Sequence, residues 1–104
     1  MERVEELEFD DAFFEHMTAE ARRYDKHIVA QREVMEVFRG NPVYTLNSGD
    51  NRRAPLIMLG PTRSARMIVV PLEPTHRRGV WRPVTAFEAN AHHRGRYQKE
   101  RGNG

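Results

Sequence analysis

The chain has 104 residues, 38% of them hydrophobic, and a formal net charge of +2. This length suits one domain with a modest core, so we expect a single domain over residues 1–104. The absence of cysteine excludes a disulfide framework, a thiolate nucleophile and a zinc site built on cysteine. The N-terminus is acidic and no segment approaches about 18 apolar residues, so we expect a soluble, cytoplasmic protein with no membrane partner.

The first part of the chain predicts one strand and two helices. Apolar and acidic residues alternate over 6–9, which predicts a short half-buried strand. Apolar residues then recur at helical spacing over 11–24 and again over 29–38. Asp10 and Asp11 are both good N-cap candidates for the first helix, and Gly40 ends the second.

The rest of the chain predicts a sheet followed by a helix. Apolar runs separated by turn residues predict four strands, over 43–46, 55–59, 67–72 and 80–86. A weaker helical pattern over 88–101 closes the chain. We therefore expect an α+β fold. A curled antiparallel sheet of about four to five strands would pack with two N-terminal helices and one C-terminal helix.

Charge is distributed unevenly along the chain. Residues 1–38 carry 11 acidic and 5 basic side chains (net −6), whereas residues 39–104 carry 4 acidic and 12 basic ones (net +8). Eleven of those 12 cations are arginine, whose planar fork suits phosphate and carboxylate groups. This pattern favours RNA, DNA or an acidic protein as ligand, and a solvated basic surface without a ligand is the alternative.

Lys26 and His27 form the sharpest local pair and fall between the two predicted helices. Histidine transfers protons near neutral pH, and lysine can hold a phosphate or a developing negative charge. A surface pair at a helix end is the competing interpretation.

Four arginines lie next to or within the predicted strands: Arg52, Arg53, Arg66 and Arg82. Antiparallel pairing brings alternate residues of neighbouring strands to one face, so these side chains could converge on one phosphodiester. Taken singly, each arginine is more simply an exposed strand charge, except that Arg82 lies inside an apolar run.

His93 and Tyr97 share one face of the last predicted helix because they are four residues apart. They could present an imidazole and a phenol to RNA, or form a core tyrosine with a bystander histidine. His92 and His93 diverge on a helix, so zinc binding is not expected. His16 and His76 have no comparable neighbours in the sequence.

Seven short motifs in one order give the chain a resemblance to the BrnT family of ribonuclease toxins. The resemblance covers nearly the whole chain. Its motifs are Phe9-Asp10, Lys26-His27-Ile28-Val29, Glu36-Val37-Phe38 with Asn41-Pro42, Arg53, Leu59-Gly60 with Arg66-Met67-Ile68-Val69-Val70, Trp81-Arg82-Pro83-Val84-Thr85-Ala86, and Arg94 to Tyr97.

The resemblance implies a RelE-like fold, RNA cleavage without a metal or other cofactor, and neutralisation by a ribbon-helix-helix antitoxin. Oligomers of that family form through the antitoxin, commonly as heterotetramers. By motif position it implies that Lys26 and His27 are active-site residues. It further implies that Arg53, Arg66 and Arg82 bind phosphate and that Tyr97 contacts the substrate.

The chain departs from the family pattern at three positions. Ile28 replaces a glycine, Phe87 replaces an arginine, and His93 falls where a glutamate is usual. These changes are compatible with a slow nuclease, a rewired nuclease in which His93 replaces the carboxylate, or a protein that only binds.

The mechanism expected from the residues needs only a base, an acid and cations, because RNA supplies its own 2′-OH nucleophile. His27 and His93 would exchange protons with the RNA. Lys26 and three arginines, namely Arg53, Arg66 and Arg82, would hold the phosphate. The alternative from another class is a non-catalytic basic module that binds nucleic acid or an acidic protein. A homo-oligomeric structural protein is a third, weaker option.

Overall fold

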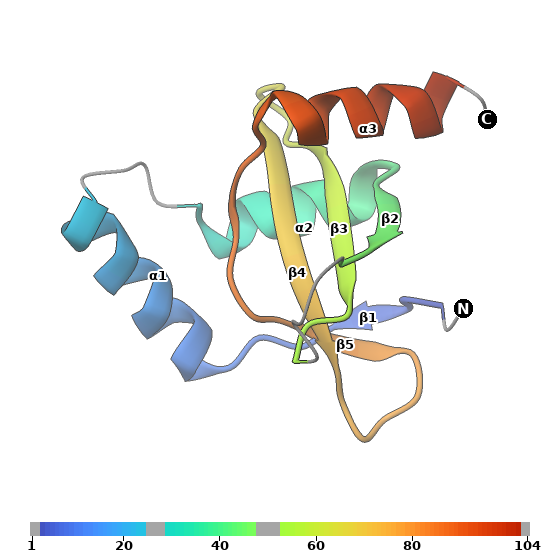
Figure 1. Ribbon diagram of the computed structural model, residues 1–104. Helices are drawn as coiled ribbons and strands as arrows, with labels where there is room; N and C mark the ends of the chain where they lie inside the picture. The colour runs from blue at the N-terminus through green and yellow to red at the C-terminus, as the bar shows by residue number, and fades with distance from the viewer. Residues whose placement is uncertain (1–2, 25–28, 48–52, 103–104) are drawn as a thin grey trace.

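The computed structural model describes residues 3–24, 29–47 and 53–102, which form an α+β protein with three helices and one six-stranded sheet (Figure 1). The helices are α1 (Asp11–Tyr24), α2 (Gln31–Gly40) and α3 (Ala91–Gly102). The strands are β1 (Glu6–Leu7), β2 (Val43–Leu46), β3 (Leu56–Pro61), β4 (Met67–Pro74), β5 (Val80–Pro83) and β6 (Phe87–Glu88). None of the helices in these ranges is long and apolar enough to cross a membrane.

The sheet is mixed, which corrects the expectation of an antiparallel sheet of four to five strands. Its order is β1-β5-β4-β3-β2, and β6 pairs with β4. The other pairs are antiparallel, but β1 runs parallel to β5, with Leu7 opposite Trp81. The sequence between β1 and β5 contains two helices and three strands, so a parallel edge pair is possible without a tight turn.

Most element boundaries follow the sequence pattern, and the main difference lies at Pro83. The strand expected over 80–86 ends there because proline lacks the N–H that a ladder needs. Val84 N–H still donates to the Pro71 carbonyl at 2.9 Å. The chain then leaves β4 and returns as β6 opposite Ile68 and Val69.

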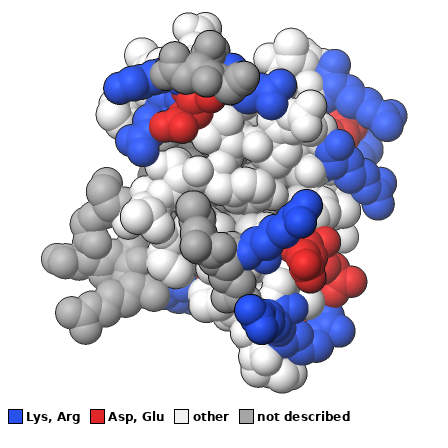
Figure 2. All heavy atoms as spheres, turned by 90° about the vertical axis from the view of Figure 1, so that its right-hand side faces the viewer, with Lys and Arg blue, Asp and Glu red and all other residues white. Residues whose placement is uncertain are grey.

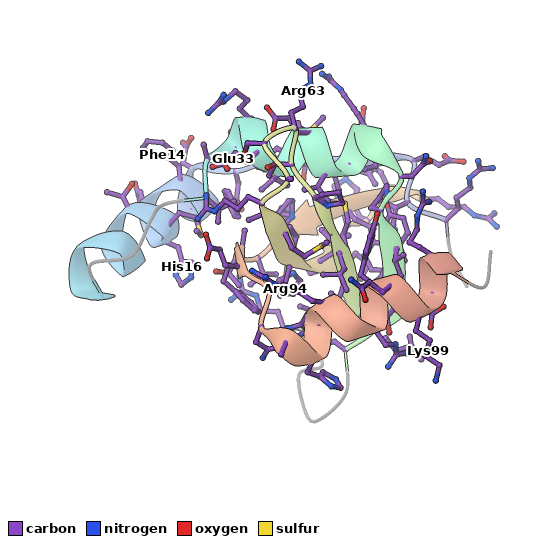
Figure 3. The ribbon with its side chains drawn as sticks, turned by 90° about the horizontal axis from the view of Figure 1, so that it is seen from above. Phe14, His16, Glu33, Arg63, Arg94 and Lys99 are labelled. Atoms are coloured by element: carbon purple, nitrogen blue, oxygen red, sulfur yellow. The ribbon has the colours of Figure 1, made fainter. Side chains whose placement is uncertain are left out.

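The sheet carries helices on both faces, as the view from above shows (Figure 3). On one face, Val34 and Val37 of α2 are fully buried in a core cluster that includes Met58 of β3 and Val70 of β4. On the other face, a smaller apolar cluster is partly covered by Tyr97 of α3; its buried members are Leu59, Val69 and Ala89. The alternation of side chains along β3 and β4 produces these two faces.

Helix α1 extends away from the rest of the molecule (Figure 1). Its first turn is capped by Asp10, whose Oδ1 accepts the N–H of Phe13 at 2.9 Å, which confirms the predicted cap. Phe13 and Met17 bury one side of the helix in the core. Phe14 is 69% exposed on another side.

Candidate functional site

Arg82 lies on the sheet face opposite the main core. Trp81, which precedes Arg82 in β5, and Leu72, which precedes Glu73 in the neighbouring strand β4, both belong to that core. Side chains alternate along a strand, and Arg82 pairs with Glu73 across β4 and β5, so both charged groups lie on the other face. This placement removes the burial cost that an arginine within an apolar run would otherwise carry.

Three carboxylates surround the Arg82 guanidinium. Nη2 donates to Glu8 Oε2 at 2.7 Å, and Nη1 donates to Glu73 Oε1 at 3.4 Å. Nε lies 3.6 Å from Asp10 Oδ2, an ion pair beyond hydrogen-bond distance. The hydrogen bond to Glu8 is the largest cause acting on the pKa of Arg82, which is raised although burial opposes the shift. The positive charge of Arg82 is therefore largely balanced within the molecule.

Glu73 joins Arg82 to a second predicted site residue, Arg53. Arg53 Nε donates to Glu73 Oε2 at 3.1 Å, and the Arg53 side chain is 71% exposed. Each oxygen of Glu73 thus faces a different guanidinium. The two arginines come together as expected, and Arg53 is the one whose charge reaches solvent.

A pocket of about 220 Å³ lies beside these groups, where the start of α1 meets the end of β5. Charged or polar side chains from four parts of the chain line it, with a few apolar residues between them. The ionisable lining residues are Asp10, His16, Arg53, Glu73 and Arg82.

Sequence reasoning missed three ionisable residues of this pocket, namely Asp10, Glu73 and His16. His16 Nε2 lies 3.1 Å from Thr85 Oγ1, and Thr85 Oγ1 lies 3.6 Å from Met17 Sδ. If the Thr85 hydroxyl donates its single proton to the Met17 sulfur, His16 Nε2–H must donate to the Thr85 oxygen. Nδ1 of His16 is then the nitrogen that can accept a proton. His16 and Thr85 are 69 positions apart, so no local spacing could indicate their contact.

Arg66 lies apart from Arg53 and Arg82. It precedes β4, and the strand from Met67 to Glu73 spans about 20 Å at about 3.3 Å per residue. Arg66 also reaches Glu33 of α2, on the face opposite Arg82. The structure therefore does not gather the three predicted arginines around one phosphate.

Two carboxylates hold Arg66 at its end of the sheet. Nη1 lies 3.0 Å from Glu33 Oε2, and Nε donates to Glu88 Oε1 at 2.6 Å. Burial lowers the pKa of Arg66, but hydrogen bonds to Glu88 and Glu33 outweigh it, so the pKa is raised. The interaction ties α2 and β6 to the start of β4.

His93 and Tyr97 lie on α3, near Arg66 and away from the pocket. The His93 ring centroid is 6.1 Å from that of Phe87, which precedes the Arg66 partner Glu88. Burial, and then the neighbouring His92, lower the pKa of His93. Tyr97 packs against the smaller apolar cluster, which agrees with the core-tyrosine interpretation.

The remaining predicted residues, Lys26, His27 and Arg52, lie outside the described residues, as does the departure at Ile28. Phe87, the second departure, is 42% exposed beside His93. Within the described ranges, no three histidine, aspartate or glutamate side chains are grouped so that they could hold a metal ion.

Positive charge on the face shown in Figure 2 gathers in separate groups, with acidic side chains beside several of them. No protein-family model matches the chain, and no curated protein matches it. The described residues form an α+β protein with a charged pocket beside Arg53 and Arg82, and the chemistry of that pocket is the basis for a functional proposal.

Proposed function

We propose that this chain is a metal-independent endoribonuclease of the toxin class that acts in the cytoplasm. The observation that carries the proposal is the pocket, which brings an imidazole, two carboxylates and two guanidinium groups together. These are the group types that transesterification of RNA needs, namely proton-transfer groups and cations at the phosphate.

The pocket suggests a role for each group in the reaction. A carboxylate, Asp10, takes the proton of the 2′-OH while the 2′ oxygen attacks the adjacent phosphorus. Protonated His16 gives a proton to the departing 5′ oxygen, and Arg53 and Arg82 stabilise the charge on the phosphorane. The products are a 2′,3′-cyclic phosphate and a free 5′-OH.

His16 takes over in this proposal the part that His93 had in the expectation from sequence. Burial, and then the neighbouring His92, lower the pKa of His93, which disfavours the protonated imidazole that a proton donor needs. Lys26 and His27, which follow α1 in the chain, keep their predicted roles as a phosphate contact and a proton-transfer group.

The RelE-like fold and the antitoxin belong to the same proposal. The order of a strand, two helices, a run of strands and a final helix agrees with the order that the apolar pattern of the sequence predicts, and the proposal adds that these elements form a RelE-like fold. A ribbon-helix-helix antitoxin would cover the charged pocket and form oligomers with the chain, and their association would weaken as salt rises.

A second candidate function is binding of RNA without cleavage. It is favoured over cleavage by the ion pairs of Arg82, because the carboxylates that balance its charge weaken the stabilisation that a phosphorane would receive in the pocket. The two functions differ in whether the pocket acts on a bound RNA.

Cleavage of a fluorescent single-stranded RNA in EDTA tests the choice. Loss of one positioned acid or base costs on the order of 10²-fold or more in rate, so His16→Ala should lose that much. His76→Ala is the matched control, because His76 is exposed on the turn between β4 and β5. Equal rates for wild type and His16→Ala would exclude His16 from the reaction, and no cleavage above background would leave the binding function.

A further inference from the structure

A groove of about 660 Å³ lies on the outer side of α2, away from the pocket. Its wall on one side is the exposed face of α2, whose opposite face buries Val34 and Val37. Its wall on the other side is Arg63, in the loop between β3 and β4. Figure 3 shows Arg63 at the outer edge of the molecule beside α2. The lining residues are Gln31, Arg32, Met35, Glu36, Arg39, Gly40 and Arg63.

The two walls are held in a fixed relation. Glu36 Oε1 accepts the backbone N–H of Arg63 at 3.0 Å, which fastens the loop to the helix. Below this contact the chain passes close to α2, since a Cβ at Gly60 would lie only 3.1 Å from Val37 Cγ1. The loop that carries Arg63 is therefore held against α2, which carries the other two arginines of the groove, Arg32 and Arg39.

The three groove arginines differ from the arginines of the predicted site. Among the described residues, Arg32, Arg39 and Arg63 form no ion pair and are exposed. The one carboxylate in the groove, Glu36, is hydrogen-bonded to backbone. The groove thus concentrates positive charge that the fold leaves available.

The shape and chemistry of the groove fit an extended phosphodiester chain better than a protein segment. Three separate guanidinium groups can each contact a phosphate of one chain. Among the described residues that line the groove, Met35 is the only one with a large apolar side chain, whereas protein interfaces depend on larger apolar or aromatic anchors. We infer that this groove binds the backbone of single-stranded RNA and forms a second, non-catalytic binding site for the substrate.

This inference rests on the proposed function for the identity of its ligand, but the groove shares no lining residue with the pocket. The two sites can therefore be tested separately. Binding measures the groove, and cleavage of a short substrate measures the pocket.

The binding test uses fluorescence anisotropy with a labelled 12-nucleotide oligouridine over a range of salt concentrations. The variant is Arg32→Gln, Arg39→Gln and Arg63→Gln combined. The control is Arg94→Gln, Lys99→Gln and Arg101→Gln combined, which removes the same charge from exposed residues of α3. Figure 3 shows Arg94 and Lys99 leaving α3 on different sides, so they form no common groove.

We expect the groove variant to bind about 10-fold or more weakly. Its log–log salt slope should fall by about 2, because each phosphate contact on a single strand contributes about 0.7. The control should bind within about threefold of wild type. Equal losses in both variants, or no loss in the groove variant, would overturn the inference. It would also be overturned if poly-glutamate displaced the RNA more effectively than unlabelled oligouridine.

Cleavage of the dinucleotide UpA in EDTA separates this inference from the proposed function. Wild type and the groove variant should cleave it at equal rates. If wild type cleaves UpA and the groove variant binds oligouridine as tightly as wild type, the RNA-binding role of the groove is refuted and the catalytic proposal stands. A wild-type protein that fails to cleave UpA but loses oligouridine binding in the groove variant would refute the catalytic proposal alone.

Discussion

Arg66 and Arg82 each bind carboxylates from more than one element. Arg66 joins Glu33 of α2 to Glu88 of β6, and Arg82 joins Glu73 of β4 to Glu8, which follows β1. Such pairs fix the relative positions of elements, and removing one partner leaves a charge without its counterion. At both positions arginine therefore has a structural role, which for Arg82 is additional to the phosphate contact that we propose.

The first prediction concerns Arg66. Arg66→Met should lower the free energy of unfolding by about 2 kcal/mol, because Glu33 is left only 14% exposed beside Glu88. Arg77→Met is the control, since the Arg77–Glu6 pair is mostly exposed and should contribute about 0.5 kcal/mol. Urea denaturation measures both variants. Equal losses would show that Arg66 has no special role.

The second prediction concerns the protonation of His93. Its pKa in the folded protein lies below the ordinary value of 6.5, so the unfolded chain binds a proton more readily. The free energy of unfolding should therefore fall as the pH drops below about 6.5. His93→Gln should flatten this dependence, and His76→Gln should not. Denaturation at several pH values measures it, and an unchanged pH dependence in His93→Gln would contradict the assignment.

At the scale of elements, the packing of α2 against the sheet depends on a close approach at the end of β3. Val34 and Val37 of α2 are fully buried, and Gly60 of β3 lies next to Val37 and Pro42. The absence of a side chain at Gly60 permits this distance. The same contact positions the loop that carries Arg63.

The third prediction follows from that contact. A Cβ at position 60 would lie 3.3 Å from the Pro42 Cα as well as near Val37, so Gly60→Ala should destabilise the protein by about 1–3 kcal/mol. Gly95→Ala on α3 meets nothing within 4 Å and should stabilise it by up to about 1 kcal/mol. Thermal unfolding measures both changes. A neutral or stabilising Gly60→Ala would show that α2 can shift away.

The elements themselves could be predicted well from local patterns. The bounds of α1 and β2 agree with the predicted ones, because apolar spacing and turn residues act over short ranges. The parallel pairing of β1 with β5 could not be predicted, because Leu7 and Trp81 meet only in the folded chain. The division of the strand at Pro83 had a visible signal, the missing N–H of proline.

At the scale of the whole molecule, the candidate site shows where sequence reasoning ends. The approach of Arg53 and Arg82 was expected, because both lie in or beside strands of one sheet, but their shared partner Glu73 was not. The separation of Arg66 was not, because it depends on which partner Arg66 finds among the helices. His16 joined the pocket through the packing of α1 against the segment after β5.

Part of the uneven charge along the chain is balanced by ion pairs between its two parts. Acidic residues of the first part bind arginines of the second part; the pairs are Glu6–Arg77, Glu8–Arg82, Asp10–Arg82 and Glu33–Arg66. Some of the segregated charge therefore serves contacts within the molecule. Among the described residues, the arginines outside these pairs offer a polyanion more available charge than the paired ones.

The most direct test of the central claim is the chemical nature of the ends produced from RNA in EDTA. Purified protein is incubated with a single-stranded RNA and with the DNA of the same sequence, and the products are analysed by mass spectrometry. The proposal predicts that only the RNA is cut and that the new ends are 2′,3′-cyclic phosphate, or the 3′-phosphate formed from it, and 5′-OH. Cleavage of the DNA, new ends with 5′-phosphate, or intact RNA after long incubation would contradict it.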